Sequence, residues 1–244
     1  MKTVQFLSNS PKIDNIVKGF TLTKSLFVSS LLIGEPYTGK KTLIKSLFPD
    51  ALYIDATHQD ELLLALEKHE EIVIYNFEKL LNFEELNFEN HRIIAIANHI
   101  ENSIKIEKKF AFIYHMPTIE EREDFQAILE HFKDKIQDEL MITQESHLEV
   151  EQLDLSQNIK SLRASIYRQL VNQHLSQSDI ESILYRYLLK HLHGNNAYRD
   201  NISLFERPLI QAGLALHKSQ LKLSSVLGLN RNTLRKKIHE HGLD

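Results

Sequence analysis

The sequence of 244 residues contains no cysteine and no tryptophan. Without cysteine there is no disulfide framework, no zinc site built on thiolates and no cysteine nucleophile, although sites built from histidine or carboxylates stay open. No apolar run approaches the roughly 20 residues that a membrane helix needs, and residues 1–5 lack the apolar core of a signal peptide. We therefore expect a cytoplasmic protein with no membrane partner, and we assign it no metal site.

Glycine and proline are also scarce, with 7 and 5 residues. Together they make up about 5% of the chain, against roughly 12% in average usage, so turns should be few and helices many. The hydrophobic fraction of 42% and the charged fraction of 25% are those of an ordinary globular protein, which disfavours disordered and coiled-coil classes. The length allows one large domain, or a medium domain with a small appendage.

The net charge is small, because 29 Lys and Arg oppose 33 Asp and Glu to give -4. Taken over the whole chain, this balance argues against a nucleic-acid partner. The charge is unevenly distributed, however. Residues 215–244 contain six basic and two acidic residues, so they carry +6 - 2 = +4 and the remainder carries -4 - 4 = -8. The C-terminal end is therefore the candidate for binding double-stranded DNA.

A glycine loop lies between a short β-rich apolar run at residues 26–33 and a segment with helical spacing at residues 43–48. Gly34 and Gly39 stand five positions apart and Lys40 follows, which gives the pattern G-x-x-x-x-G-K of a phosphate-binding loop. Backbone N–H groups of such a loop and the helix N-terminus can bind phosphate oxygens while the lysine supplies a charge. We interpret the segment as descended from a nucleotide-binding loop; the alternative is a plain strand-to-helix turn.

The residue after the loop lysine departs from this pattern. A Ser or Thr normally stands there and binds Mg²⁺ through its hydroxyl, but position 41 is Lys41, and Thr42 comes one residue late. The sequence therefore leaves open whether ATP or ADP still binds.

Further short β-rich runs alternate in part with helical patterns such as residues 59–69, which indicates a buried parallel sheet of the α/β class. Ligands of such sheets bind beyond the carboxyl ends of the strands, where Asn76 and Asn98 stand. A hydrolytic P-loop ATPase normally offers an Asp for Mg²⁺ at such a strand end, and many follow it with a Glu. Here the strand ends in Asn76 and Phe77 instead. The expected strands lie at residues 51–55, 72–75, 93–98 and 110–114.

Over residues 5–175, the chain resembles the central domain of NtrC-type sigma-54 activators, a clade of AAA+ ATPases. Residues 34–41 are similar to the family's phosphate loop GESGTGKE, and residues 91–98 to the strand that ends in its sensor Asn. Residues 114–125 resemble the segment IHLPPLRER-x-EDI, and residues 155–162, more weakly, the second sensor GNVREL. The resemblance implies a P-loop AAA+-like parallel sheet followed by a helical subdomain. It implies the following nucleotide-site residues: Gly34, Gly39, Lys40, Lys41, Thr42, Asn76, Asn98 and Lys160.

The departures from the family concern its catalytic groups. Tyr37 replaces a loop glycine, Asn76 and Phe77 replace the Asp-Glu pair, and Lys160 stands in place of the second-sensor Arg. Only Lys108 and Lys109 occupy the region of the Arg fingers, and Lys lacks the planar fork of Arg. We therefore expect no catalytic residue and no ATPase activity; the alternative is an active P-loop ATPase tethered to DNA.

The family's contact with sigma-54 is also missing. About 30 residues separate Thr42 from Ile72, too few for the family's insertion with its GAFTGA loop, and that motif occurs nowhere in the chain. We expect no sigma-54 contact.

Residues 152–192 show helical spacing, which predicts a helical lid or bundle packed on the sheet. The segment 191–196 then resembles a linker. His191 and His193 lack a third ligand nearby and are more typical of a helix C-terminal turn than of a metal site.

Beyond the linker, two short helices at residues 219–227 and 230–238 flank Gly228, in the form of a helix-turn-helix. Asn230 is a good N-cap, and basic and amide side chains on the second helix could contact bases and phosphates. Residues 227–237 closely resemble the Fis-type signature LG-[IL]-x-R-x-TLR-x-K that ends NtrC-type activators. The expected DNA-binding residues are Ser219, Gln220, Asn230, Arg231, Asn232, Thr233, Arg235, Lys236 and Lys237.

These observations predict three parts: a degenerate AAA+-like P-loop α/β domain at 1–135, a helical lid at 136–193 and a Fis-type domain at 194–244. The resemblance implies a homodimer formed through the helices of residues 195–216, which would read a pseudo-palindromic site. We expect a sequence-specific DNA-binding transcriptional regulator whose AAA+-like module serves assembly or sensing.

Overall fold

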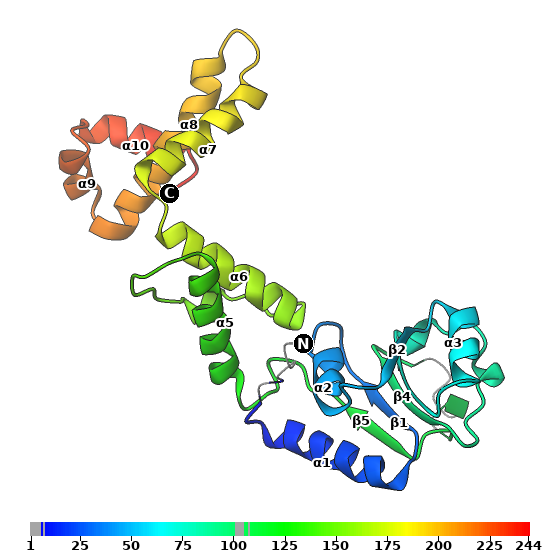
Figure 1. Ribbon diagram of the computed structural model, residues 1–244. Coiled ribbons are helices and arrows are strands. Elements are labelled where there is room, and N and C mark those ends of the chain that lie inside the picture. Colours follow the sequence, from blue (N-terminus) through cyan, green and yellow to red (C-terminus); the bar gives the residue numbers. More distant parts are fainter. Residues whose placement is uncertain (1–5, 7, 101–104, 107) are drawn as a thin grey trace. The chain divides into compact units, whose positions relative to one another are not determined.

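A computed structural model of the chain describes residues 6, 8–100, 105–106 and 108–244 (Figure 1). Residues 1–5, on which the signal-peptide argument rested, lie outside this part. The chain divides into two compact units, Met1–His174 and Leu175–Asp244, and each is described by itself.

The first unit is built on a five-stranded sheet in the order β2-β3-β4-β1-β5, in which every neighbouring pair is parallel. The central strand β4 is buried along its whole length, which is why it appears in the sequence as an unbroken apolar run. The predicted parallel α/β sheet is thus confirmed. Its strands are β1 (Ser30–Ile33), β2 (Leu52–Asp55), β3 (Glu71–Tyr75), β4 (Arg92–Ala97) and β5 (Phe112–His115).

Helices cover both faces of this sheet (Figure 1). On one face, α1 (Pro11–Leu26) and α2 (Lys40–Leu47) enclose a core centred on Phe20, Leu32 and Ile94. On the other face lie α3 (Gln59–Leu66) and the 3-10 turns η1 (Phe77–Lys79) and η2 (Phe83–Glu85). This arrangement brings the carboxyl ends of the strands and the N-terminus of α2 to one edge.

The helix α1 was missed by the sequence interpretation, and the predicted strand at 26–33 is too long. Leu26 is the last residue of α1, Phe27 ends the helix with φ 50°, and the strand begins only at Ser30. A short apolar run does not distinguish a buried helix end from a strand, which explains the error.

The lid is part of the first unit. It consists of α5 (Phe125–Glu139), a 3-10 turn η3 (Val150–Gln152) and α6 (Asn158–Gln173). Their shared core includes Ile136, Leu162 and Ile166. The predicted domain boundary between residues 135 and 136 falls inside α5, because that helix runs continuously through it.

The second unit consists of four helices: α7 (Gln177–His191), α8 (Ala197–His217), α9 (Gln220–Val226) and α10 (Arg231–Glu240). A capping box between Ser176 and Asp179 starts α7, and the division of the chain falls just before it. This division differs from the predicted boundary at 193/194, which placed α7 with the lid. The small core of the unit is formed by Ile210, Leu223, Leu234 and Ile238.

Across the described ranges, no helix is both long and apolar enough to span a bilayer. Nor do three His, Asp or Glu side chains in those ranges gather so as to hold a metal ion. His191 and His193 contact the carbonyl oxygens of Tyr187 and Lys190, as expected of a helix C-terminal turn.

Candidate functional site

The glycine loop has the geometry of a phosphate-binding loop. Gly39 has φ 96°, a conformation that L side chains rarely adopt, and α2 begins at the next residue. At Gly34, a Cβ atom would lie 2.7 Å from the carbonyl oxygen of Met116, so the close approach of the two backbones requires glycine. The backbone conformation therefore requires glycine at position 39, and the available space requires it at position 34.

Lys40 is buried, and its ammonium group folds back onto the loop. Its Nζ donates to the carbonyl oxygens of Gly34 and Glu35, at 2.6 Å each, and to Oδ1 of Asn98 at 3.2 Å. Burial lowers the pKa of Lys40 from 10.5 to about 8, because desolvation disfavours the charged form more than Glu78 and Glu35 favour it.

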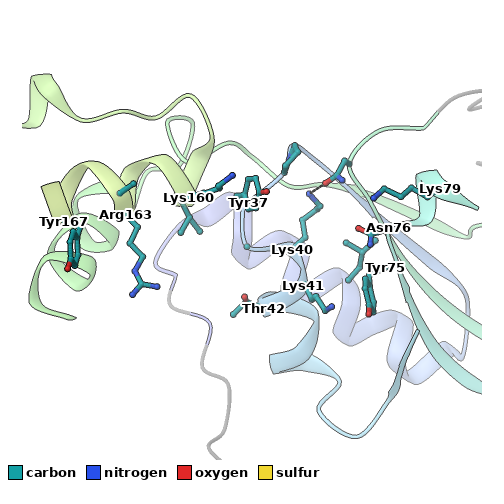
Figure 2. A pocket seen from close by; sticks show the side chains of 16 residues that line it. Tyr37, Lys40, Lys41, Thr42, Tyr75, Asn76, Lys79, Lys160, Arg163 and Tyr167 are labelled. Atoms are coloured by element: carbon teal, nitrogen blue, oxygen red, sulfur yellow. Dashed lines mark hydrogen bonds between the residues drawn. The ribbon is translucent and has the colours of Figure 1, made fainter. Parts of the chain in front are cut away.

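A pocket of about 990 Å³ opens at this edge of the first unit, between the loop, the ends of β3 and β4, and α6 (Figure 2). Its size is that of a ligand site. Among the described residues, no Asp or Glu lines it, whereas five cationic side chains do. These are Lys40, Lys41, Lys79, Lys160 and Arg163. The pocket is therefore suited to an anion.

Lys41 lies on the exposed side of α2, beside Tyr75 (Figure 2). Its Nζ is 3.2 Å from the centroid of the Tyr75 ring, a cation–π contact that places the charge at the end of β3. Desolvation and the neighbouring charge of Lys45 lower the pKa of Lys41. Thr42 also lines the pocket, one residue further along the helix.

The amides at the strand ends are held by carboxylates. Asn76 has φ 55°, and its Nδ2 donates to Oδ2 of Asp55 at 2.8 Å. Desolvation would raise the pKa of Asp55, but hydrogen bonds from Thr57 and Asn76 outweigh it and lower that pKa. Glu78 accepts from both the backbone N–H and the side-chain Nδ2 of Asn98. Both carboxylates are therefore occupied by protein donors.

The start of α6 is bound to the loop through Asn158. This side chain is only 3% exposed, and its Nδ2 donates to Oε2 of Glu35 at 3.0 Å and to the carbonyl of Pro36 at 3.1 Å. Its Oδ1 accepts from the N–H of Ile119. One residue on, the N–H of Ile159 donates to the carbonyl of Tyr37 at 3.2 Å. These bonds connect lid and loop.

The structure brings the predicted nucleotide-site residues together. Seven of them line the pocket, and the eighth, Gly34, accepts a hydrogen bond from Lys40. Sequence reasoning missed Lys79, Arg163 and Tyr167 as lining residues and Asn158 as the link to the lid. Arg163 and Tyr167 follow Lys160 at helical spacing, three and seven residues later. If α6 had been assigned to the site, this spacing would have identified both residues from the sequence.

The second unit presents a helix-turn-helix. In α10, Oδ1 of Asn230 accepts from the N–H of Asn232 at 2.9 Å, so Asn230 is the predicted N-cap. Leu234 and Ile238 face the core, while the opposite side of α10 is exposed. The predicted residues Arg231, Asn232, Thr233, Arg235 and Lys236 are all exposed.

Several of the residues predicted for DNA binding have partners within the chain. Besides Asn230, Lys236 has its Nζ 3.7 Å from Oε1 of Glu240, one turn further along α10, in an exposed ion pair. Lys237 is half-buried and donates to Glu206 of α8, and this hydrogen bond is the main reason that the pKa of Glu206 is lowered. Ser219 is the N-cap of α9, where its Oγ accepts from the N–H of Lys222. Gln220 beside it is exposed.

Comparisons with known proteins show what the chain is similar to. Residues 202–241 match the family described as "Bacterial regulatory protein, Fis family". The fold resembles crystal structures of NtrX from Brucella abortus. In complex with ATP, NtrX aligns with a TM-score of 0.52 at 12% sequence identity, over 98% of this chain and 69% of that one. In complex with ADP, the TM-score is 0.50, with the same identity and coverage. No curated protein sequence matches the chain.

The fold therefore resembles that of NtrX, and the C-terminal part of the chain is similar to the Fis family. An AAA+-like module with a parallel five-stranded sheet is followed by a Fis-type helix-turn-helix, as the resemblance implied. Residues 202–241 of the second unit are thus similar to a Fis-type helix-turn-helix.

Proposed function

We propose that the protein is a sequence-specific transcriptional regulator that binds double-stranded DNA as a homodimer. Its AAA+-like module does not hydrolyse ATP and does not contact sigma-54. The Fis-type match supports DNA binding, and the geometry of the two units supports the finer statements.

The exposed face of α10 carries the proposal. Arg231 and Asn232 occupy the first turn of the helix, and Arg235 and Lys236 follow one turn later. Arg can bind O6 and N7 of guanine, Asn can bind N6 and N7 of adenine, and Lys can neutralise phosphates. Helix-turn-helix domains place the N-terminal part of this second helix against base edges.

The exposed apolar side chains of α7 and α8 support the homodimer. Within the second unit, α7 buries no residue, although Ile180, Ile183, Leu184 and Tyr187 follow helical spacing on it. On α8, Phe205 is 61% exposed. A second copy of the chain would cover these side chains and place two reading helices about a two-fold axis, as a pseudo-palindromic site requires.

The end of β3 supports the absence of hydrolysis. Asn76 replaces the carboxylate that would hold Mg²⁺, and Phe77 after it is buried and cannot polarise water. Glu78 is engaged with Asn98. Between α2 and β3, the chain forms only β2, α3 and short connections, with no inserted loop to contact sigma-54.

Selection of bound sequences from a random DNA pool, followed by gel-shift titration, tests the regulator. We expect the full chain to enrich a pseudo-palindromic sequence and Arg231→Ala to lose the preference for it. Recovery of no common sequence, or an unchanged preference in Arg231→Ala, contradicts the proposal. Phosphate release from ATP that needs Mg²⁺ and disappears in Lys40→Ala would instead support the alternative, an active ATPase tethered to DNA.

A further inference from the structure

The charge of the pocket has a consequence for the form in which a ligand binds. We propose that the pocket binds a nucleoside polyphosphate free of divalent cation, with lysine side chains supplying the positive charge that Mg²⁺ supplies in P-loop ATPases. This inference deepens the proposed non-hydrolytic role of the AAA+-like module and rests on it.

Lys41 is the first position where a lysine stands in place of a group that would bind Mg²⁺. In a P-loop ATPase, the residue after the loop lysine binds Mg²⁺ through a hydroxyl oxygen. An ammonium group has three donors and no acceptor, so it cannot ligate a cation and would repel one. The Nζ of Lys41 already lies at the end of β3, over the ring of Tyr75, and the side chain lines the pocket. It is therefore placed to bind phosphate oxygens directly.

Lys79 is the second such position. It lies in the segment that follows β3. A P-loop ATPase places an Asp for the metal at the end of this kind of strand. Here the strand ends in Asn76, whose amide nitrogen is directed to Asp55, and Lys79 lines the pocket three residues later. Figure 2 shows Lys79 and Asn76 close together on the sheet side of the pocket. Both segments that would hold a metal thus contribute an ammonium group.

The opposite wall adds further positive charge. Lys160 and Arg163 extend from α6, while Lys40 lies on the loop side (Figure 2). A polyphosphate that binds Mg²⁺ has two fewer negative charges than the metal-free form. The positive charge of the pocket therefore favours the metal-free form over the Mg²⁺ complex. Tyr37, whose ring has Nζ of Lys160 at 4.8 Å from its centroid, and Ile159 supply aromatic and apolar surface for a base. This surface favours a nucleoside polyphosphate over inorganic triphosphate.

Isothermal titration calorimetry of the full chain tests the proposal, with ATP in excess EDTA and in excess Mg²⁺. We expect binding in EDTA to be the tighter of the two. Lys41→Gln should weaken binding of metal-free ATP by about tenfold, since a hydrogen bond to a charged group is lost. Binding of the Mg²⁺ complex should change less. Because Lys41 is exposed, the variant should fold, which its thermal unfolding verifies.

Lys45→Gln is the matched control. Lys45 lies one turn further along α2, over the ring of Tyr53, but it does not line the pocket. We expect Lys45→Gln to change the affinity for ATP much less than Lys41→Gln does, because Lys45 acts on Lys41 only through its charge. Lys79→Gln should reproduce the loss seen in Lys41→Gln, because both cations are assigned to the same phosphate chain.

Binding that requires Mg²⁺, no binding of ATP in either buffer, or an unchanged affinity in Lys41→Gln would overturn the inference. Inorganic triphosphate that binds as tightly as ATP would overturn the assignment of a nucleoside. These results leave the proposed DNA-binding function untouched. A separate measurement, phosphate release from ATP in the presence of Mg²⁺, tests the proposed lack of hydrolysis. Release of phosphate would contradict that proposal.

Discussion

Asn158 and Glu35 are joined by a hydrogen bond of 3.0 Å across 123 positions of the chain. The same amide group donates to the carbonyl of Pro36, and its oxygen accepts from Ile119. A single buried side chain thus connects the glycine loop, the start of α6 and the segment after β5. The lid is attached to the loop by these bonds within the chain itself.

We predict that Asn158→Ala lowers the free energy of unfolding of the first unit by about 1–3 kcal/mol, because buried partners are left unpaired. It should also weaken ATP binding, since the loop carbonyls lose their anchor. Urea denaturation and calorimetry measure the two effects. Asn172→Ala, an exposed substitution on the same helix, is the control and should change neither. Equal effects of both variants would contradict the assigned role.

Binding of an anion should depend on pH through Lys40. Its pKa is lowered to about 8, and a bound polyphosphate favours the charged ammonium and raises that pKa again. Between the two pKa values, the complex holds a proton that the free protein lacks. Affinity for ATP should therefore fall as the pH rises above 8, by up to about tenfold per pH unit.

Calorimetric titrations from about pH 7 to about pH 9.5 check this dependence. DNA affinity of the same protein is the control, because Lys40 belongs to the first unit and not to the helix-turn-helix. An ATP affinity that is constant or rises with pH would rule out the assigned role of Lys40.

Lys236→Ala tests whether the second turn of α10 contacts phosphates. We predict weaker binding to all DNA sequences alike, and a salt dependence of the binding constant that is smaller by about one unit. Filter binding at several salt concentrations measures both quantities. Lys135→Ala removes an exposed charge from α5 in the other unit and should leave the slope unchanged. The prediction fails if Lys236→Ala alters sequence preference but not the slope.

Ile183→Gln tests the dimer. Ile183 is 56% exposed on α7, so in a monomer its replacement should change stability by no more than about 0.5 kcal/mol. In a homodimer, the same change buries a polar group, and we predict dissociation at a higher protein concentration. Light scattering over a dilution series shows the shift. Ser178→Gln, on the same helix, should leave the mass unchanged, and equal behaviour of the two variants would argue against the interface.

The sequence predicted the parts of the fold that depend on local signals. The parallel strands were visible because buried strands are continuous apolar runs, and the start of α10 was visible because Asn230 caps its own helix. The glycine loop was recognised because Gly34, Gly39 and Lys40 follow the G-x-x-x-x-G-K pattern between a strand and a helix.

Long-range contacts account for what was missed. Asn158 acts on Glu35, which is far away in sequence, and nothing local marks that bond. Lys237 resembles its neighbours on a basic helix, and only the packing of α8 against α10 reveals its pairing with Glu206. The boundary before α7 follows from contacts of whole helices, whereas the linker signal at residues 191–196 marks only a turn between two helices of one unit.

Helix α8 is a single helix of 21 residues that joins the exposed Phe205 to the core of the helix-turn-helix. Phe205 on it faces outward, while Ile210 and Gly213 pack into the helix-turn-helix, where a Cβ on Gly213 would collide with Leu223. At 1.5 Å per residue, the helix is about 31 Å long. In the proposed homodimer, the contact at Phe205 and the helix-turn-helix would be joined by one helix, so that helix would fix the separation of the two half-sites. Insertion of one residue between Phe205 and Ile210 would turn the helix-turn-helix by about 100° and put the half-sites out of phase.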